Sequence, residues 1–185
     1  MILARPARRL KRQLRRLAND ERGVSAVEFA MLLPLMMTLY LGGVEVSQAV
    51  AVDRKVTLIA RTVGDLVAQT TTVSNSDMSN ILAAATAVAA PYSDTNLKVV
   101  VSRVDVDAQS VAKVVWSDTK NGTKRTVGST VTLPTALNTA STSLIWAETQ
   151  YAYTPTVGYV ITGTLNLTDQ IYMRPRLSDT VARTP

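Results

Sequence analysis

The sequence predicts an α+β fold in which one long N-terminal helix packs on a small antiparallel sheet. The first observation is an apolar stretch with helical spacing from residue 24 to about residue 69. The second is a set of alternating apolar and polar segments between residues 98 and 174. The chain has 185 residues, of which 46% are hydrophobic, so it is long enough for a core and too apolar for a disordered protein.

Residues 1–23 form a basic leader. This segment has eight Lys and Arg side chains against two acidic ones, so it carries the whole net charge of +6, and the remaining 162 residues are neutral. A solvated tail and a nucleic-acid-binding arm are two interpretations of such a leader. The apolar stretch that follows favours a third, a cytoplasmic leader that keeps the N-terminus inside.

Residues 24–52 are predicted to be a transmembrane helix. Residues 29–44 have no charged side chain, and only Glu28 and Glu45 interrupt the longer apolar range. Because a bilayer core takes about 20 helical residues, the range is long enough to span it. It exceeds the apolar region of a secretory signal peptide, and no Ala-x-Ala site follows it. A plain signal anchor, with Glu28 tolerated at the interface, stays open.

The helix is expected to continue beyond the membrane through residues 53–70. Apolar residues recur on one side at spacings of three and four, at Val52, Val56, Ile59, Val63 and Leu66. This amphipathic part is suited to cover a sheet. Pro34 removes one helical hydrogen bond, so a kink or local melting is predicted at that point.

Residues 71–185 are predicted to form a periplasmic α+β domain. A linker precedes a second helix, which is expected to be capped by Asp77 and to end before Pro91. Strands are predicted at residues 98–107, 111–118, 126–133, 144–153 and 171–174.

The first two strands are joined by a short connection, which predicts that they form an antiparallel hairpin. Ala112, Val114 and Trp116 are expected to share one face of the second strand, because they alternate with polar residues.

No catalytic or metal-binding set stands out in the sequence. The chain has no cysteine and no histidine, which excludes disulfides, Cys or His metal ligands, a Cys nucleophile and a histidine general base. Asp105 and Asp107 share one side of a strand and could bind a cation, but a solvated strand face is the commoner explanation. We therefore expect no enzyme activity and no cofactor.

The boundary between the leader and the helix carries the motif Arg22-Gly23-Val24-Ser25-Ala26-Val27-Glu28-Phe29. It resembles the processing site of type IV pilins, in which a prepilin peptidase cuts after the glycine and a glutamate is the fifth residue of the mature chain. The wider pattern, with Pro34 and Gly43-Val44-Glu45, resembles the TadE/TadG-like proteins of the tight-adherence (Flp) pilus. Residues 146–155 and 174–176 resemble the C-terminal half of that family more loosely.

The resemblance implies a type IV pilin-like fold and a minor pilin-like role in a type IVc pilus, acting in surface adhesion. It implies peptidase cleavage between Gly23 and Val24, and registration of the subunit by Glu28, which would pair with the new α-amino group. Phe29, Pro34 and Glu45 belong to the same processing and helix motif.

The resemblance also implies partners and a location. The expected partners are the prepilin peptidase, other pilins or minor pilins, and the inner-membrane assembly platform, with no nucleic acid. The expected location is the bacterial inner membrane, with the N-terminus cytoplasmic and the C-terminal domain periplasmic.

Two other functions remain open. A single-pass periplasmic adhesin or envelope-binding module would need the helix only as a tether. A basic-tailed DNA-binding protein would need the leader to stay attached and the apolar range to be buried.

Overall fold

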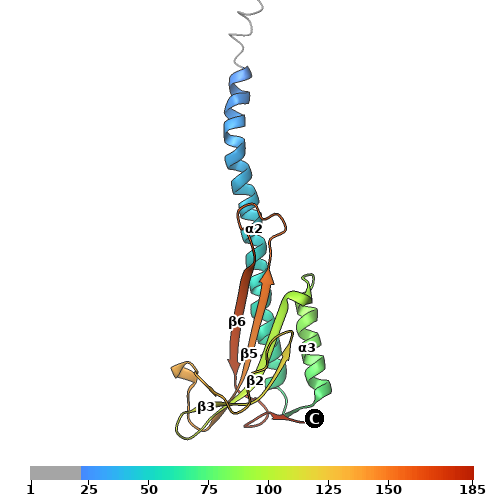
Figure 1. Cartoon of the computed structure of the whole chain (residues 1–185), viewed down its shortest axis with the longest axis vertical. Coiled ribbons are helices and arrows are strands. Elements are labelled where there is room, and N and C mark those ends of the chain that lie inside the picture. The colour runs from blue at the N-terminus through green and yellow to red at the C-terminus, as the bar shows by residue number, and fades with distance from the viewer. Residues whose placement is uncertain (1–21) are drawn as a thin grey trace, which may run out of the picture.

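The computed structural model describes residues 22–185, so the predictions for the leader before Arg22 lie outside the described residues. Its main element is the helix α2, Arg22–Ala68, whose 47 residues correspond to a length of about 70 Å. Figure 1 shows the second half of α2 against the rest of the protein, while the first half projects alone. The continuous helix predicted from residue 24 to about residue 69 is confirmed.

The helix α2 passes through Pro34 without interruption, so the local melting offered as one outcome there is absent. Proline lacks only its own N–H, and the turns on either side keep their helical bonds. One turn later the Thr38 hydroxyl donates a hydrogen bond to the Pro34 carbonyl oxygen at 2.8 Å.

The sheet has five antiparallel strands in the order β4-β3-β2-β5-β6, and the predicted α+β fold is confirmed. Its bounds are β2 Leu97–Val106, β3 Ala112–Lys120, β4 Thr130–Val131, β5 Thr142–Tyr153 and β6 Leu165–Met173. The packed half of α2 lies against β5 and β6 (Figure 1). Short 3-10 turns at Asp94–Asn96 and Thr135–Leu137 lie in the connections.

The second helix, α3 (Asn75–Ala89), packs against α2 and ends before Pro91, as predicted. The expectation that Asp77 caps it was wrong by one turn. Ser74 is the N-cap, and Asp77 is the third helical residue of a capping box, in which each side chain bonds the other residue's backbone N–H. At the other end, the Lys55 ammonium of α2 donates to the carbonyl oxygens of Val88 and Ala90.

The main core lies between α2, α3 and the sheet. The apolar stripe predicted along α2 contributes Val52, Val56, Ile59 and Val63, each at most 1% exposed, whereas Leu66 is 36% exposed. The strands contribute Leu97, Val99, Val101, Trp116, Ile145, Ala147, Tyr151 and Tyr153. A close approach is needed at Gly64, where an added Cβ would lie 3.3 Å from Ile171.

A smaller core covers the opposite face of the sheet. It is built from Val104, Val106, Ala112, Val114, Leu133, Leu144 and Trp146. The expectation that Trp116 shares a face with Ala112 and Val114 was wrong, because the pairing of β2 with β3 shifts between Arg103 and Val104. At this bulge Trp116 pairs with Arg103, and Val114 pairs with the next residue, Val104. Trp116 therefore points into the main core instead.

The remaining strands differ from the prediction in length. The strand predicted at residues 126–133 is reduced to β4, since Gly128 adopts a φ of 82° within a turn. The strand predicted at residues 171–174 is longer, because β6 pairs with β5 from Leu165 to Met173. A two-residue parallel pair, β1 (Thr72–Val73) with β7 (Ala182–Arg183), was not predicted and ties the C-terminal tail to the start of α3.

Candidate membrane helix and its junction with the domain

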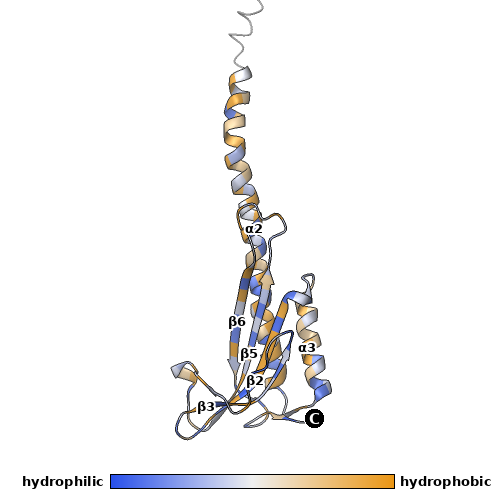
Figure 2. Ribbon diagram, viewed as in Figure 1, coloured by the Kyte–Doolittle hydropathy of each residue, from blue (hydrophilic) through white to orange (hydrophobic). Residues whose placement is uncertain are grey.

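The projecting half of α2 is apolar and uncovered. Every residue from 23 to 40 is exposed, and large side chains such as Met31 and Tyr40 are 76% and 69% exposed. Figure 2 shows hydrophobic residues along this projecting part. The helix from Gly23 to Ala68 contains an 18-residue window with a mean hydropathy of 1.8, none of it buried, and by length and composition it could cross a membrane.

The residues of the expected processing motif lie at the projecting end of α2. An added Cβ on Gly23 would meet nothing within 4 Å, and Val24 and Phe29 are 56% and 57% exposed. Glu28 is exposed too and follows Val24 by about one helical turn. Among residues 22–185, nothing covers this end of the helix.

Glu45 lies in a different environment from Glu28. Its side chain is 1% exposed, about 26 Å farther along the helix axis. The carboxylate accepts three backbone hydrogen bonds, from the N–H groups of Tyr159 at 2.6 Å, Val160 at 3.0 Å and Ile161 at 2.7 Å. A buried carboxylate needs such partners, since an unpaired one is costly to remove from water.

The three donors belong to the connection between β5 and β6, residues 154–164, which we call the junction loop. Figure 1 shows it beside α2 at the point where the helix leaves the domain. It packs closely there, because an added Cβ on Gly42 would lie 3.1 Å from a methyl group of Val160. The hydroxyl groups of Tyr159 and Thr38 lie 3.4 Å apart.

The sequence interpretation placed Glu45 in a motif but missed the loop that binds it. A sequence signal was present, because residues 154–168 contain no charged side chain. Gly158 also marks a turn there, with a φ of 63° that other residues adopt with strain. The pairing itself joins residues more than 110 positions apart, and no local pattern predicts it.

Residues 23–65 match the model of the TadE-like protein family. The match confirms the resemblance over the segment that contains Gly23, Glu28, Pro34 and Glu45, and the TadE-like segment takes up less than a quarter of the chain. No curated protein and no solved structure matches this chain. The TadE-like segment therefore comprises the projecting half of α2, the junction with the domain and most of the packed half.

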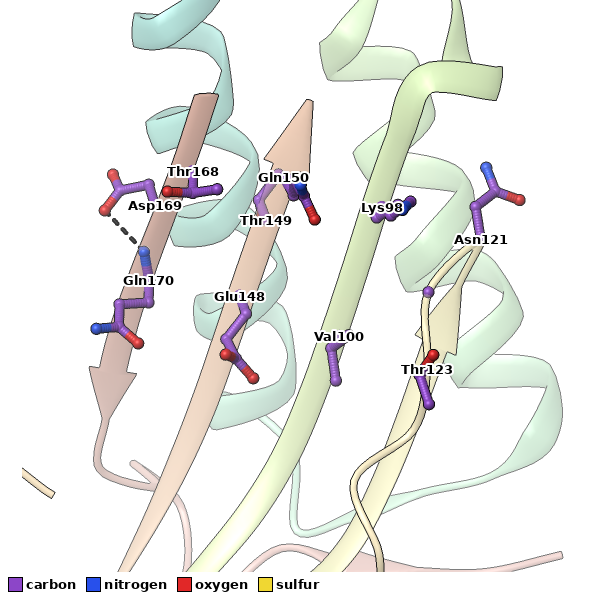
Figure 3. Close-up of a pocket in the computed structure, with 11 residues that line it drawn as sticks. Lys98, Val100, Asn121, Thr123, Glu148, Thr149, Gln150, Thr168, Asp169 and Gln170 are labelled. Atoms are coloured by element: carbon purple, nitrogen blue, oxygen red, sulfur yellow. Dashed lines mark hydrogen bonds between the residues drawn. The ribbon is translucent and has the colours of Figure 1, made fainter. Parts of the chain in front are cut away.

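Beyond the TadE-like segment, a hollow lies on the face of the sheet that looks away from α2 and α3 (Figure 3). It has a volume of about 800 Å³ and is open to solvent. The lining is mostly polar, from Lys98, Val100, Asn121, Gly122, Thr123, Glu148, Thr149, Gln150, Thr168, Asp169 and Gln170.

A polar and aromatic cluster borders this hollow. Arg125 forms two hydrogen bonds with the Glu148 carboxylate, at 2.8 and 2.7 Å, and its guanidinium lies 3.6 Å from the ring centre of Trp146. Trp146 stacks on Tyr172 and donates its indole N–H to Gln170 at 3.1 Å. These contacts hold Glu148 in an ion pair with Arg125 at the border of the hollow.

The two aspartates considered for a cation are occupied otherwise. Asp105 pairs with Arg103, and Asp107 accepts hydrogen bonds from the backbone N–H groups of Gln109 and Val111, at 3.0 and 2.9 Å. Within residues 22–185 no group of three or more acidic side chains could hold a metal ion. In the described part of the chain the pair therefore shapes a strand and its turn.

The C-terminal tail is fixed to the sheet by Asp118, which is partly buried. Its carboxylate accepts hydrogen bonds from Arg183 of β7 at 2.7 Å and from Lys124 at 2.9 Å. Burial by itself raises the pKa of Asp118, but the hydrogen bonds and charges of Arg183 and Lys124 outweigh burial, and the pKa lies below its usual value. Trp116 adds a hydrogen bond from its indole N–H to the Val181 carbonyl oxygen at 2.9 Å.

Proposed function

We propose that this chain is a minor pilin-like structural protein of a type IVc (Flp/Tad) pilus, anchored in the bacterial inner membrane. The single observation that carries the proposal is the division of α2 into two halves. One half is apolar and exposed, the other half is buried against a sheet, and the TadE-like match runs through both. A helix that first spans a membrane and then packs in a bundle of pilin helices needs an exposed apolar surface of this kind.

The orientation follows from the charge distribution. The basic leader would stay in the cytoplasm, and the domain that begins after the apolar half would lie in the periplasm. The proposed partners are the prepilin peptidase, other pilins or minor pilins, and the inner-membrane assembly platform. The proposed role of the domain is structural and adhesive, not catalytic.

The exposed end of α2 supports a role for Glu28 in assembly. Cleavage after Gly23 would create an α-amino group on Val24, one turn from the Glu28 carboxylate. In an apolar surrounding, the carboxylate would pair with such a cation in its own subunit or in a neighbour. Val24 and Glu28 are both exposed, so pairing within one subunit and pairing between two subunits are both sterically allowed.

The mass of the protein tests the proposed processing. In a host that expresses the cognate peptidase, we expect the intact mass to fall by the mass of residues 1–23, and Gly23→Ala to keep the full mass. Gly43→Ala is the matched control, because it changes a second exposed glycine of α2 where an added Cβ also meets nothing within 4 Å. Retention of the leader in the unmodified protein and in both variants alike would contradict the proposal.

A second candidate function is a membrane-anchored periplasmic adhesin, and the polar hollow on the outer face of the sheet favours it. The two functions differ in what they need from the projecting half of α2. Replacing residues 24–41 by an unrelated spanning helix leaves Glu45 and the packed half intact. We expect this exchange to abolish pilus assembly while the protein stays in the membrane fraction, whereas an adhesin would keep full activity.

A further inference from the structure

We propose that the junction loop is a second membrane contact, which lies on the outer boundary of the bilayer beside α2. The exposed apolar surface of the loop contacts lipid, in the zone between the headgroups and the acyl chains. This inference rests on the membrane anchoring in the proposed function and adds a site to it.

The chemistry of the junction loop suits an interface. The loop and the first residues of β6, from 154 to 168, have no charged side chain, so nothing in this run opposes contact with lipid. Three apolar side chains of the loop are left uncovered by the domain: Val157 is 58% exposed, Tyr159 54% and Val160 48%. Tyrosine is enriched at membrane interfaces, because its ring is apolar and its hydroxyl is polar.

The position of the loop agrees with the thickness of a bilayer. Residues 23–40 are exposed without exception, and they correspond to about 27 Å of helix. A bilayer core is about 30 Å thick, so a helix that enters near Gly23 emerges near Gly42. The loop meets α2 at this level, through Thr38, Gly42 and Glu45.

The charges on α2 are consistent with the same boundary. After Glu45 the next charged residue is Asp53, about 12 Å farther into the domain. Glu45 itself faces the loop backbone, which shields it from the surroundings. The loop thus allows a carboxylate to lie close to the membrane without contact with lipid.

The hydrogen bonds to Glu45 also fix the direction of the loop. They draw three successive N–H groups toward the helix, at Tyr159, Val160 and Ile161. The side chains of Val157 and Tyr159 remain exposed. A loop held in this way can enter the interface without a cost for ordering it at that moment.

Single-cysteine labelling tests the inference, since the chain has no native cysteine. A nitroxide is placed at Val157→Cys in the full chain, reconstituted at one copy per phosphatidylcholine nanodisc. Power saturation then compares its collisions with oxygen, which enters lipid, and with a water-soluble nickel chelate. The matched controls are Val127→Cys, 65% exposed in the segment before β4, and Met31→Cys, 76% exposed on the projecting helix.

We expect the label at position 157 to show several-fold more oxygen than nickel exposure relative to position 127, and a lower ratio than position 31, as for a site at the boundary of the bilayer. Equal ratios at positions 157 and 127, with position 31 in lipid, would overturn the inference and leave the anchoring intact. A water-exposed label at position 31 would overturn the anchoring itself. If the label at position 157 is protected from the nickel chelate only when a disc holds several copies, the surface is covered by a neighbouring subunit. That result would overturn the lipid contact.

Discussion

Replacing Glu45 by glutamine is expected to release the junction loop from α2. The glutamine keeps one acceptor oxygen but brings an NH₂ group toward three backbone N–H donors, so at least one donor loses its partner. We expect the amide hydrogens of Tyr159, Val160 and Ile161 to exchange faster by roughly tenfold, because opening of the loop no longer breaks a charge-assisted network. Hydrogen exchange measured by mass spectrometry on peptides from residues 154–164 reports the change.

The matched control for this prediction is Glu28→Gln. It makes the same chemical change on the same helix, at a carboxylate that is exposed. Exchange in the junction loop should stay at the level of the unmodified protein in this variant. Unchanged exchange in Glu45→Gln would mean that the packing of Val160 on Gly42 holds the loop without the carboxylate.

Replacing Asp118 by asparagine is expected to loosen the C-terminal tail in a pH-dependent way. The variant removes the charge that Arg183 and Lys124 share, and we expect the free energy of unfolding at pH 7 to fall by about 2 kcal/mol. The folded protein lowers the pKa of Asp118, so the stabilisation is fully present above the unfolded-state pKa of about 3.9. It is lost as the pH falls through the lower pKa of the folded state.

The stability difference between Asp118→Asn and the unmodified protein should therefore be constant from pH 7 to about pH 5 and shrink below about pH 4. Urea unfolding in detergent micelles, followed by Trp116 and Trp146 fluorescence, measures it at each pH. Asp179→Asn in the same tail is the control, because Asp179 is exposed. A difference that persists undiminished at pH 2 would show that the ion pairs are not its source.

The long helix and most of the sheet were predictable because their signals are local. Apolar side chains every three or four residues identified α2, and two-residue alternation identified β2 and β3. The strand β6 was predicted too short, although Leu165, Leu167 and Ile171 alternate with polar residues along it. Its exposed polar face has the composition of a loop, and only its pairing with β5 identifies it as a strand.

The features that the sequence did not predict depend on contacts between distant residues. The bulge that turns Trp116 into the main core is a property of the pairing with β2, not of the strand that carries it. Ser74 and Asp77 each have a side chain suited to cap α3, and the choice between them depends on the chain entering from β1. The bond between Glu45 and the junction loop likewise needs the whole sheet to bring its partners together.

The unbroken course of α2 couples two motions of the domain. Because one helix runs without a break from the projecting end into the core, a movement of the apolar half along the helix axis, or a rotation about it, is passed on to the domain. In the proposed pilus, a shift of one residue in the contact between the apolar half and neighbouring helices would move the domain by about 1.5 Å and turn it by about 100°. The face that the domain presents would therefore be set by the register in which the projecting apolar half packs against its neighbours.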